Sequence, residues 1–285
     1  MTVRLGRREL LASAGAFTAA AAVGAASPGR IVQKGRLKQS VCRWCYQAIP
    51  LPDFCKAVST IGLTAIDLVE EKDWPLLADH GLLCSMGWKT GGDIPDGLND
   101  PANHDLIVNG LLRTLPKAAA ARVPNLIAFF GNRKGRSDED AIKNCVAGLN
   151  RVKKAAEEHG VTICVELLNS KVDHQDYQGD RTWFGVEMVR QVASPRVKLL
   201  YDIYHMQIME GDVIRTIREQ KEWIAHFHTG GVPGRHELDD TQELNWGAVT
   251  RAIAGTGFTG YVAHEFVPLR DPLTSLREAV ALCDA

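Results

Sequence analysis

The chain has 285 residues, with 33 Lys and Arg against 34 Asp and Glu, so its formal net charge is −1. This balance argues against the strongly basic face of nucleic-acid-binding proteins and of proteins that bind anionic membranes. Hydrophobic residues make up 45% and charged residues 24%, which is typical of a folded globular protein and excludes a chain dominated by disorder.

The first 35 residues have the composition of an export signal and a linker. Arg7 and Arg8 precede an apolar, Ala-rich run at 10–26, and small residues and Pro28 follow it. This order is typical of a secretory signal, and the paired arginines resemble a twin-arginine signal, so we expect export to the periplasm. An uncleaved membrane anchor and a disordered tail are the alternatives. The run is short for a bilayer span, so no stable membrane association is expected.

Beyond this segment, short apolar runs alternate with longer segments of helical periodicity. Short β-branched runs predict strands, and apolar residues spaced three and four apart predict helices. In chain order, the expected elements are strand 39–44, helix 52–61, strand 64–69, helix 74–80, strand 83–86, helix 104–122, strand 125–130, helix 138–159, strand 161–165, helix 183–192, strand 197–201, helix 213–220, strand 224–227, helix 245–255, strand 261–263 and helix 273–282. Ser137 is expected to cap helix 138–159 and Gly160 to end it.

Eight strand–helix units in one direction predict a parallel sheet with right-handed crossovers. Over about 250 residues, such units close most naturally into a (β/α)8 TIM barrel. A doubly wound open sheet is the alternative, but it would usually carry a Gly-rich phosphate-binding motif, and neither GxGxxG nor GxxxxGK[ST] occurs. We therefore expect a signal and linker at 1–35 and one catalytic barrel domain at 36–285.

Four consecutive predicted strands end in a carboxylate or an imidazole, namely Glu166, Asp202, His228 and Glu265. Because the carboxyl ends of barrel strands share one rim, we expect these side chains to meet. Three carboxylates that converge without a cation would repel one another and lose their hydration. A set of oxygen and imidazole donors without thiolate suits one divalent metal ion, Mn2+, Mg2+ or Co2+, better than structural zinc. The alternative is that each is a salt-bridged charge of the rim.

Polar residues next to these four positions are candidates for binding the oxygens of a substrate. They are His205, Arg235, His236, Lys171 and His174. His205 and Arg235 are preferred because both lie close to proposed ligands along the chain, whereas the others could equally be solvated loop residues. His226 and His264 are expected to be hydrogen-bonded packing residues instead.

Several of these segments resemble the hydroxypyruvate isomerase family of the xylose isomerase-like TIM barrel superfamily. The matching stretches are KQSVCRWCY, VELLNS, YDIYHMQ, VPGRHELD with the nearby ELNW, and HEF. The resemblance covers nearly the whole chain after Lys38. It implies metal ligands at Glu166, Asp202, His228 and Glu265.

The resemblance leaves the substrate open. His228 matches a position that is Gln in some hydroxypyruvate isomerases and His in the ketose 3-epimerases. His205 and Arg235 match positions with which the family binds substrate.

Together these features predict a metal-dependent isomerase that acts through an enediolate on a small hydroxy-carbonyl or sugar substrate. A bound metal would acidify the C–H beside the substrate carbonyl, and Glu166 and Glu265 would remove and return the proton. The resemblance implies conversion of hydroxypyruvate to 2-hydroxy-3-oxopropanoate (tartronate semialdehyde). A ketose 3-epimerase or another sugar isomerase on the same scaffold is the alternative.

Two further readings belong to other classes of protein. An exported, non-catalytic carbohydrate-binding barrel would not need both glutamates. An endonuclease IV-like enzyme would need three zinc ions and a basic face, against which the net charge of −1 argues, so no nucleic-acid partner is expected. The sequence leaves homo-oligomer formation open.

Overall fold

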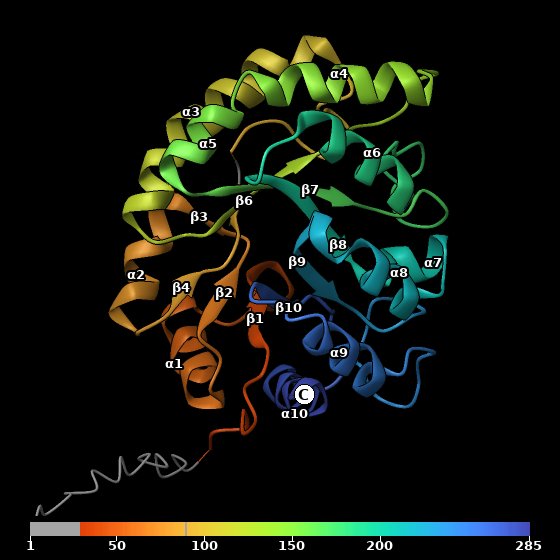
Figure 1. Cartoon of the computed structure of the whole chain (residues 1–285). Coiled ribbons are helices and arrows are strands. Elements are labelled where there is room, and N and C mark those ends of the chain that lie inside the picture. Colours follow the sequence, from red (N-terminus) through yellow and green to blue (C-terminus); the bar gives the residue numbers. More distant parts are fainter. Residues whose placement is uncertain (1–28, 89) are drawn as a thin grey trace, which may run out of the picture.

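The computed structural model describes residues 29–88 and 90–285, so the proposed signal at 1–28 lies outside the described residues. Strands form a ring at the centre of the molecule and helices surround it (Figure 1). The strands are β1 (Lys38–Cys42), β2 (Ala65–Asp67), β3 (Val69–Glu70), β4 (Leu83–Cys84), β5 (Gly87–Trp88), β6 (Asn125–Phe129), β7 (Thr162–Leu167), β8 (Val197–Asp202), β9 (Ile224–Thr229) and β10 (Tyr261–His264).

The α-helices follow the strands on the outside of the ring. They are α1 (Leu51–Ile61), α2 (Trp74–Asp79), α3 (His104–Ala120), α4 (Asp138–Asn150), α5 (Lys153–His159), α6 (Thr182–Val192), α7 (Ile203–Met209), α8 (Val213–Gln220), α9 (Trp246–Gly255) and α10 (Pro272–Cys283). Among the described residues, no helix combines the length and the apolar character needed to cross a bilayer.

The ten strands form one sheet that curls into a barrel, although the hydrogen-bonded strand order begins at β3 and ends at β4. The strand order is β3-β5-β6-β7-β8-β9-β10-β1-β2-β4, and neighbouring strands are parallel. β2 and β3 are two pieces of one interrupted strand, as are β4 and β5, and the pieces pair separately. The first interruption lies at Leu68, whose positive φ of 54° turns the chain out of the ladder. The predicted (β/α)8 barrel is therefore confirmed.

Each helix buries one face against the ring. In α1, Phe54, Val58 and Ile61 are fully buried and lie three or four residues apart, the spacing of one helical face. Gly62 follows with a φ of 101° and ends the helix, because a residue without Cβ tolerates the left-handed conformation.

The long helix expected at 138–159 is instead two helices, α4 and α5. Ser137 caps the first as predicted, with its Oγ accepting from the Asp140 N–H at 3.1 Å, and Gly160 ends the second with a φ of 68°. Between them Val152 leaves the helical conformation, with a φ of −123°, and its side chain is buried. The periodicity of the sequence continues across the break, since both helices bury an apolar face, so periodicity alone could not reveal it.

One helix, α7, was absent from the expected elements. It begins directly after β8 because the Asp202 carboxylate caps it, with Oδ1 accepting from the His205 N–H at 3.1 Å. No Gly, Pro or polar loop separates strand from helix here, so the change of structure left no signal in the sequence.

The segment before β1, expected to be a linker, is attached to the barrel. The backbone N–H groups of Gln33, Lys34 and Gly35 donate to the Asp284 carboxylate at 2.7, 2.7 and 2.8 Å. This contact joins the two ends of the described chain, where the red segment meets the dark blue α10 in Figure 1.

We expect Asp284→Asn to lower the free energy of unfolding by about 1–3 kcal/mol at neutral pH, because charge-assisted hydrogen bonds are lost. Burial raises the pKa of Asp284, but the backbone N–H groups outweigh burial and hold this pKa below its ordinary value. The stabilisation is therefore present above the ordinary carboxyl pKa and is lost as the pH falls through the lowered value. Urea unfolding at neutral and acidic pH should show the difference between the two proteins shrinking in acid.

The matched control is Asp53→Asn, since Asp53 makes only an exposed pair with Lys56 at 3.5 Å. Its stability should stay close to that of the wild type. A difference for Asp284→Asn that is independent of pH would contradict the role given to the carboxylate.

Candidate active site

The four proposed ligands come from neighbouring strands and meet at one point. Glu166 lies in β7, Asp202 ends β8, His228 lies in β9 and Glu265 directly follows β10. One donor atom from each lies within 4.8 Å of all the others, and all four side chains are buried. The parallel ring thus brings together residues that are up to about a hundred positions apart in the chain.

The spacing of the donor atoms fits a single divalent ion. His228 Nδ1 lies 2.8 Å from Glu265 Oε2, 3.2 Å from Glu166 Oε1 and 3.8 Å from Asp202 Oδ2. Adjacent ligands of an ion with bonds near 2.1 Å are about 3 Å apart. His228 Nδ1 is also buried without a hydrogen bond, which is the condition of a nitrogen aimed at a metal. The residues present therefore fit such an ion.

The electrostatics of the cluster also favour a cation. Burial raises the pKa of Glu166 and raises that of Asp202 to about 7. Burial acts in the same sense on Glu265, but the charges of Arg235 and His228 outweigh it and hold the pKa of Glu265 well below its ordinary value. A divalent ion would lower the cost of ionising all three carboxyl groups.

Arg235 supplies positive charge from the loop after β9. Its Nη2 donates to Asp202 Oδ2 at 2.7 Å and also to Glu265. Its guanidinium carbon lies 5.7 Å from the ring centre of Trp44 and 4.9 Å from that of Tyr204. Trp44 in turn donates from Nε1 to Glu265 Oε1 at 2.5 Å. These contacts hold the Glu265 carboxylate in one orientation.

His205 stands beside Arg235 in the same wall. Its Nε2 lies 2.6 Å from Arg235 Nη1, and its Nδ1 accepts from the Asn169 N–H at 3.1 Å. Burial, together with the charge of Arg235, lowers the pKa of His205 well below its ordinary value. This environment disfavours a positive charge on the imidazole of His205.

A cavity of about 700 Å3 opens above the cluster, which is the size of a small-molecule site. Glu166 and Glu265 reach its surface, whereas Asp202 and His228 lie fully buried beneath it. Other described side chains that line it include His205, Arg235, His174, Trp44, Trp88, Leu68 and Leu168.

The structure brings three of the five candidate substrate residues to the cavity. His205, Arg235 and His174 line it, whereas Lys171 and His236 do not. Lys171 Nζ donates to the Ile208 carbonyl at 2.7 Å on the outside of α7, and His236 Nδ1 lies 2.9 Å from the Val267 carbonyl. Both side chains are committed to backbone oxygens away from the cavity, which position along the chain could not show.

Sequence reasoning missed several residues of this region, among them Trp44, Trp88 and Asp67. Trp44 and Trp88 form apolar wall, and Asp67 lies behind His228. Asp67 ends β2. The rule that singled out the residues at the ends of the last four strands would have found it if applied to the second strand. Trp44 lies within the stretch KQSVCRWCY, but its indole gave no sign that it would contact Glu265. Trp88 lies in a Gly-rich region and gave no signal.

Comparison with known proteins shows which family and which relatives this chain is similar to. Residues 56–284 match the family model described as "Xylose isomerase-like TIM barrel". The chain is 28% identical over 168 residues to a "Putative hydroxypyruvate isomerase" of Drosophila melanogaster, an alignment that covers 59% of this chain but only 63% of the fly protein. It is 23% identical over 240 residues to a "2-oxo-tetronate isomerase" of Pectobacterium atrosepticum, covering 77% of this chain and 87% of that protein.

Among solved structures, the fold is similar to that of a protein titled "AP endonuclease, family 2" from Brucella melitensis. The TM-score is 0.74 at 21% identity, and the likeness covers 84% of this chain and 97% of the other. At that identity the likeness extends to the fold alone.

Proposed function

The chain belongs to the xylose isomerase-like TIM barrel family, and from this premise we propose that it is a divalent-metal-dependent isomerase of small hydroxy-carbonyl compounds. One observation carries the proposal. Three carboxylates and an imidazole from consecutive strands converge beneath a cavity, and only the two glutamates among them reach its surface. Both relatives described above carry isomerase names, which supports the same class of reaction.

The first part of the proposed chemistry is metal binding. Glu166, Asp202, His228 and Glu265 would hold the ion. When bound, that ion supplies Lewis acidity to the carbonyl and hydroxyl oxygens of the substrate.

The two glutamates act on the substrate from the cavity surface. One carboxylate removes the proton from the carbon beside the carbonyl, and a carboxyl group returns a proton to the neighbouring carbon or to the opposite face. Arg235 and His205 lie where they can hold an oxygen that gains negative charge during proton removal. Both glutamates and His205 are buried, which limits their contact with bulk water and strengthens their interactions.

The substrate we favour is hydroxypyruvate, with 2-hydroxy-3-oxopropanoate as the product. The carboxylate of hydroxypyruvate needs a fixed cation, and Arg235 presents a guanidinium at the cavity surface.

A ketose 3-epimerase is the second candidate, and the size of the cavity favours it. A three-carbon acid would fill a small part of about 700 Å3, whereas a hexose would fill much more. Trp44 and Trp88 offer the flat apolar wall against which sugar rings and chains pack.

The test is proton exchange in D2O, followed by NMR, with the protein loaded with Mn2+, Mg2+ or Co2+ and the paramagnetic ions removed before the spectra are recorded. Hydroxypyruvate isomerisation should place deuterium at C3 of recovered hydroxypyruvate and at C2 of the product. Ketose 3-epimerisation should place it at C3 of the sugar. Absence of exchange into both substrates with every metal would overturn the proposed reaction class.

A further inference from the structure

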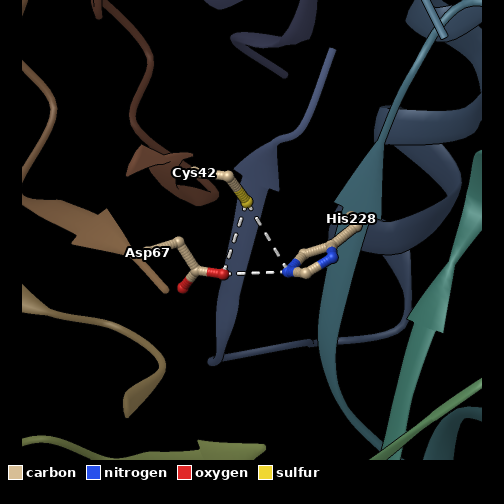
Figure 2. A group of neighbouring side chains, drawn as sticks. All are labelled: Cys42, Asp67 and His228. Carbon is tan, nitrogen blue, oxygen red and sulfur yellow. Dashed lines mark hydrogen bonds and ion pairs between the residues drawn. The ribbon is translucent and has the colours of Figure 1, made fainter. Parts of the chain in front are cut away.

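A second group of buried polar side chains lies behind His228, on the side away from the cavity. It consists of Cys42 from β1, Asp67 from β2 and His228 from β9, all without exposed surface. Figure 2 shows the thiol, one carboxylate oxygen and one ring nitrogen pointing toward one another. β2 and β9 are not neighbours in the sheet, so these side chains meet inside the barrel.

We propose that Asp67 is a positioning residue, which fixes His228 so that Nδ1 faces the metal site. The inference rests on the metal-dependent function proposed above. It assigns to Asp67 no contact with substrate or metal, only an action through His228.

The first argument is the direction of the hydrogen bond. Asp67 Oδ2 lies 2.8 Å from His228 Nε2, and an ionised carboxylate can only accept, so Nε2 carries the proton. With a metal ion bound, the imidazole is neutral and its lone pair is on Nδ1, the nitrogen that lies 2.8 Å from Glu265 Oε2. A carboxylate behind a histidine ligand sets the ring orientation and makes the metal-facing nitrogen more basic.

The second argument is that Asp67 is itself held firmly. Oδ2 also lies 3.2 Å from His226 Nε2, and Oδ1 accepts from the Ser85 hydroxyl. A carboxylate can accept from all these donors at once, whereas an amide offers one oxygen and would turn an N–H toward one of them.

Cys42 approaches the same two side chains from β1 and is fully buried. Its Sγ lies 3.6 Å from Asp67 Oδ2 and 3.8 Å from His228 Nε2, so it contributes one weak donor to the network.

The test is Mn2+ affinity, measured by titration calorimetry on the full-length protein. Asp67→Asn should bind Mn2+ about 10- to 100-fold more weakly than the wild type. The matched control is Asp284→Asn, the same change at a carboxylate that accepts three backbone N–H bonds away from the site; its affinity should stay near that of the wild type. Circular dichroism of each variant shows that it is folded.

A double-mutant cycle separates positioning from a merely structural role. In a His228→Gln background, Asp67→Asn should cause no further loss of affinity, because the ligand through which it acts is gone. In the Mg2+-bound wild type, 15N NMR should show His228 protonated at Nε2, with the signal assigned by its absence in His228→Gln.

Three results would overturn the inference: unchanged Mn2+ affinity in Asp67→Asn, the same loss in both backgrounds, or a His228 protonated at Nδ1. A wild-type protein that binds no divalent metal would instead overturn the proposed function, and this inference with it.

Discussion

Glu166→Gln and Glu265→Gln should each slow proton exchange into the substrate by about 10²- to 10⁴-fold, the usual contribution of a positioned acid or base. The amide keeps the size of the side chain and one oxygen that can bind a metal ion, but it cannot take up a proton at neutral pH. Both carboxylates reach the cavity surface, so each can meet the C–H bond of a bound substrate. The measurement is deuterium incorporation at saturating metal, because either change also weakens metal binding.

The matched control is Glu237→Gln, since Glu237 is buried at the same rim but outside the cavity. Its Oε1 accepts from the Leu269 N–H at 2.9 Å and the Ser275 hydroxyl at 2.8 Å. This variant should be less stable but, while folded, should exchange protons at the wild-type rate. If both cavity variants kept full exchange, the acid–base roles of the two glutamates would be wrong.

Removal of divalent metal should reduce exchange to the background rate and lower the thermal stability of the protein. Without the ion, the three carboxyl groups depend on Arg235 and His228 for opposite charge. Ligand binding at 100 times the dissociation constant adds about 2.7 kcal/mol to stability. For a domain of this size that corresponds to a rise in Tm of about 5–10 °C.

The experiment compares protein treated with a chelator before and after addition of Mg2+, Mn2+ or Co2+. Asp202→Asn is the informative variant, because Asp202 lies beneath the cavity and its change removes a ligand charge without removing either glutamate. Its Tm should respond less to added metal. Full exchange in chelated protein, or a Tm that is independent of divalent metal, would contradict the metal requirement.

The strand-end residues show why so much of the site could be predicted. Glu166 and Asp202 stand out because charged side chains follow buried apolar runs, and a parallel barrel has one rim at which all strands end. His226 was expected to be a hydrogen-bonded packing residue, and the structure places it fully buried with Nε2 3.2 Å from Asp67.

Loop residues were predicted less well. Arg235 and Lys171 are both cationic residues on loops after barrel strands, yet only Arg235 lines the cavity. The difference lies in the backbone of each loop, which turns Lys171 toward the carbonyl groups that end α7. Such a turn depends on contacts between segments far apart in the chain, and no local pattern records it.

By itself, the sequence determined the barrel and the identity of the groups at its rim. Periodicity and strand-end chemistry are local properties, and the parallel ring converts them into positions on one face. Only the tertiary structure decided which ring nitrogen of His228 meets the carboxylates and which loop side chains reach the cavity. It also decided that Asp67 contacts the other nitrogen of the imidazole. The reason is that these outcomes depend on side-chain directions and on distances across the barrel, between β2 and β9, which no spacing along the chain encodes.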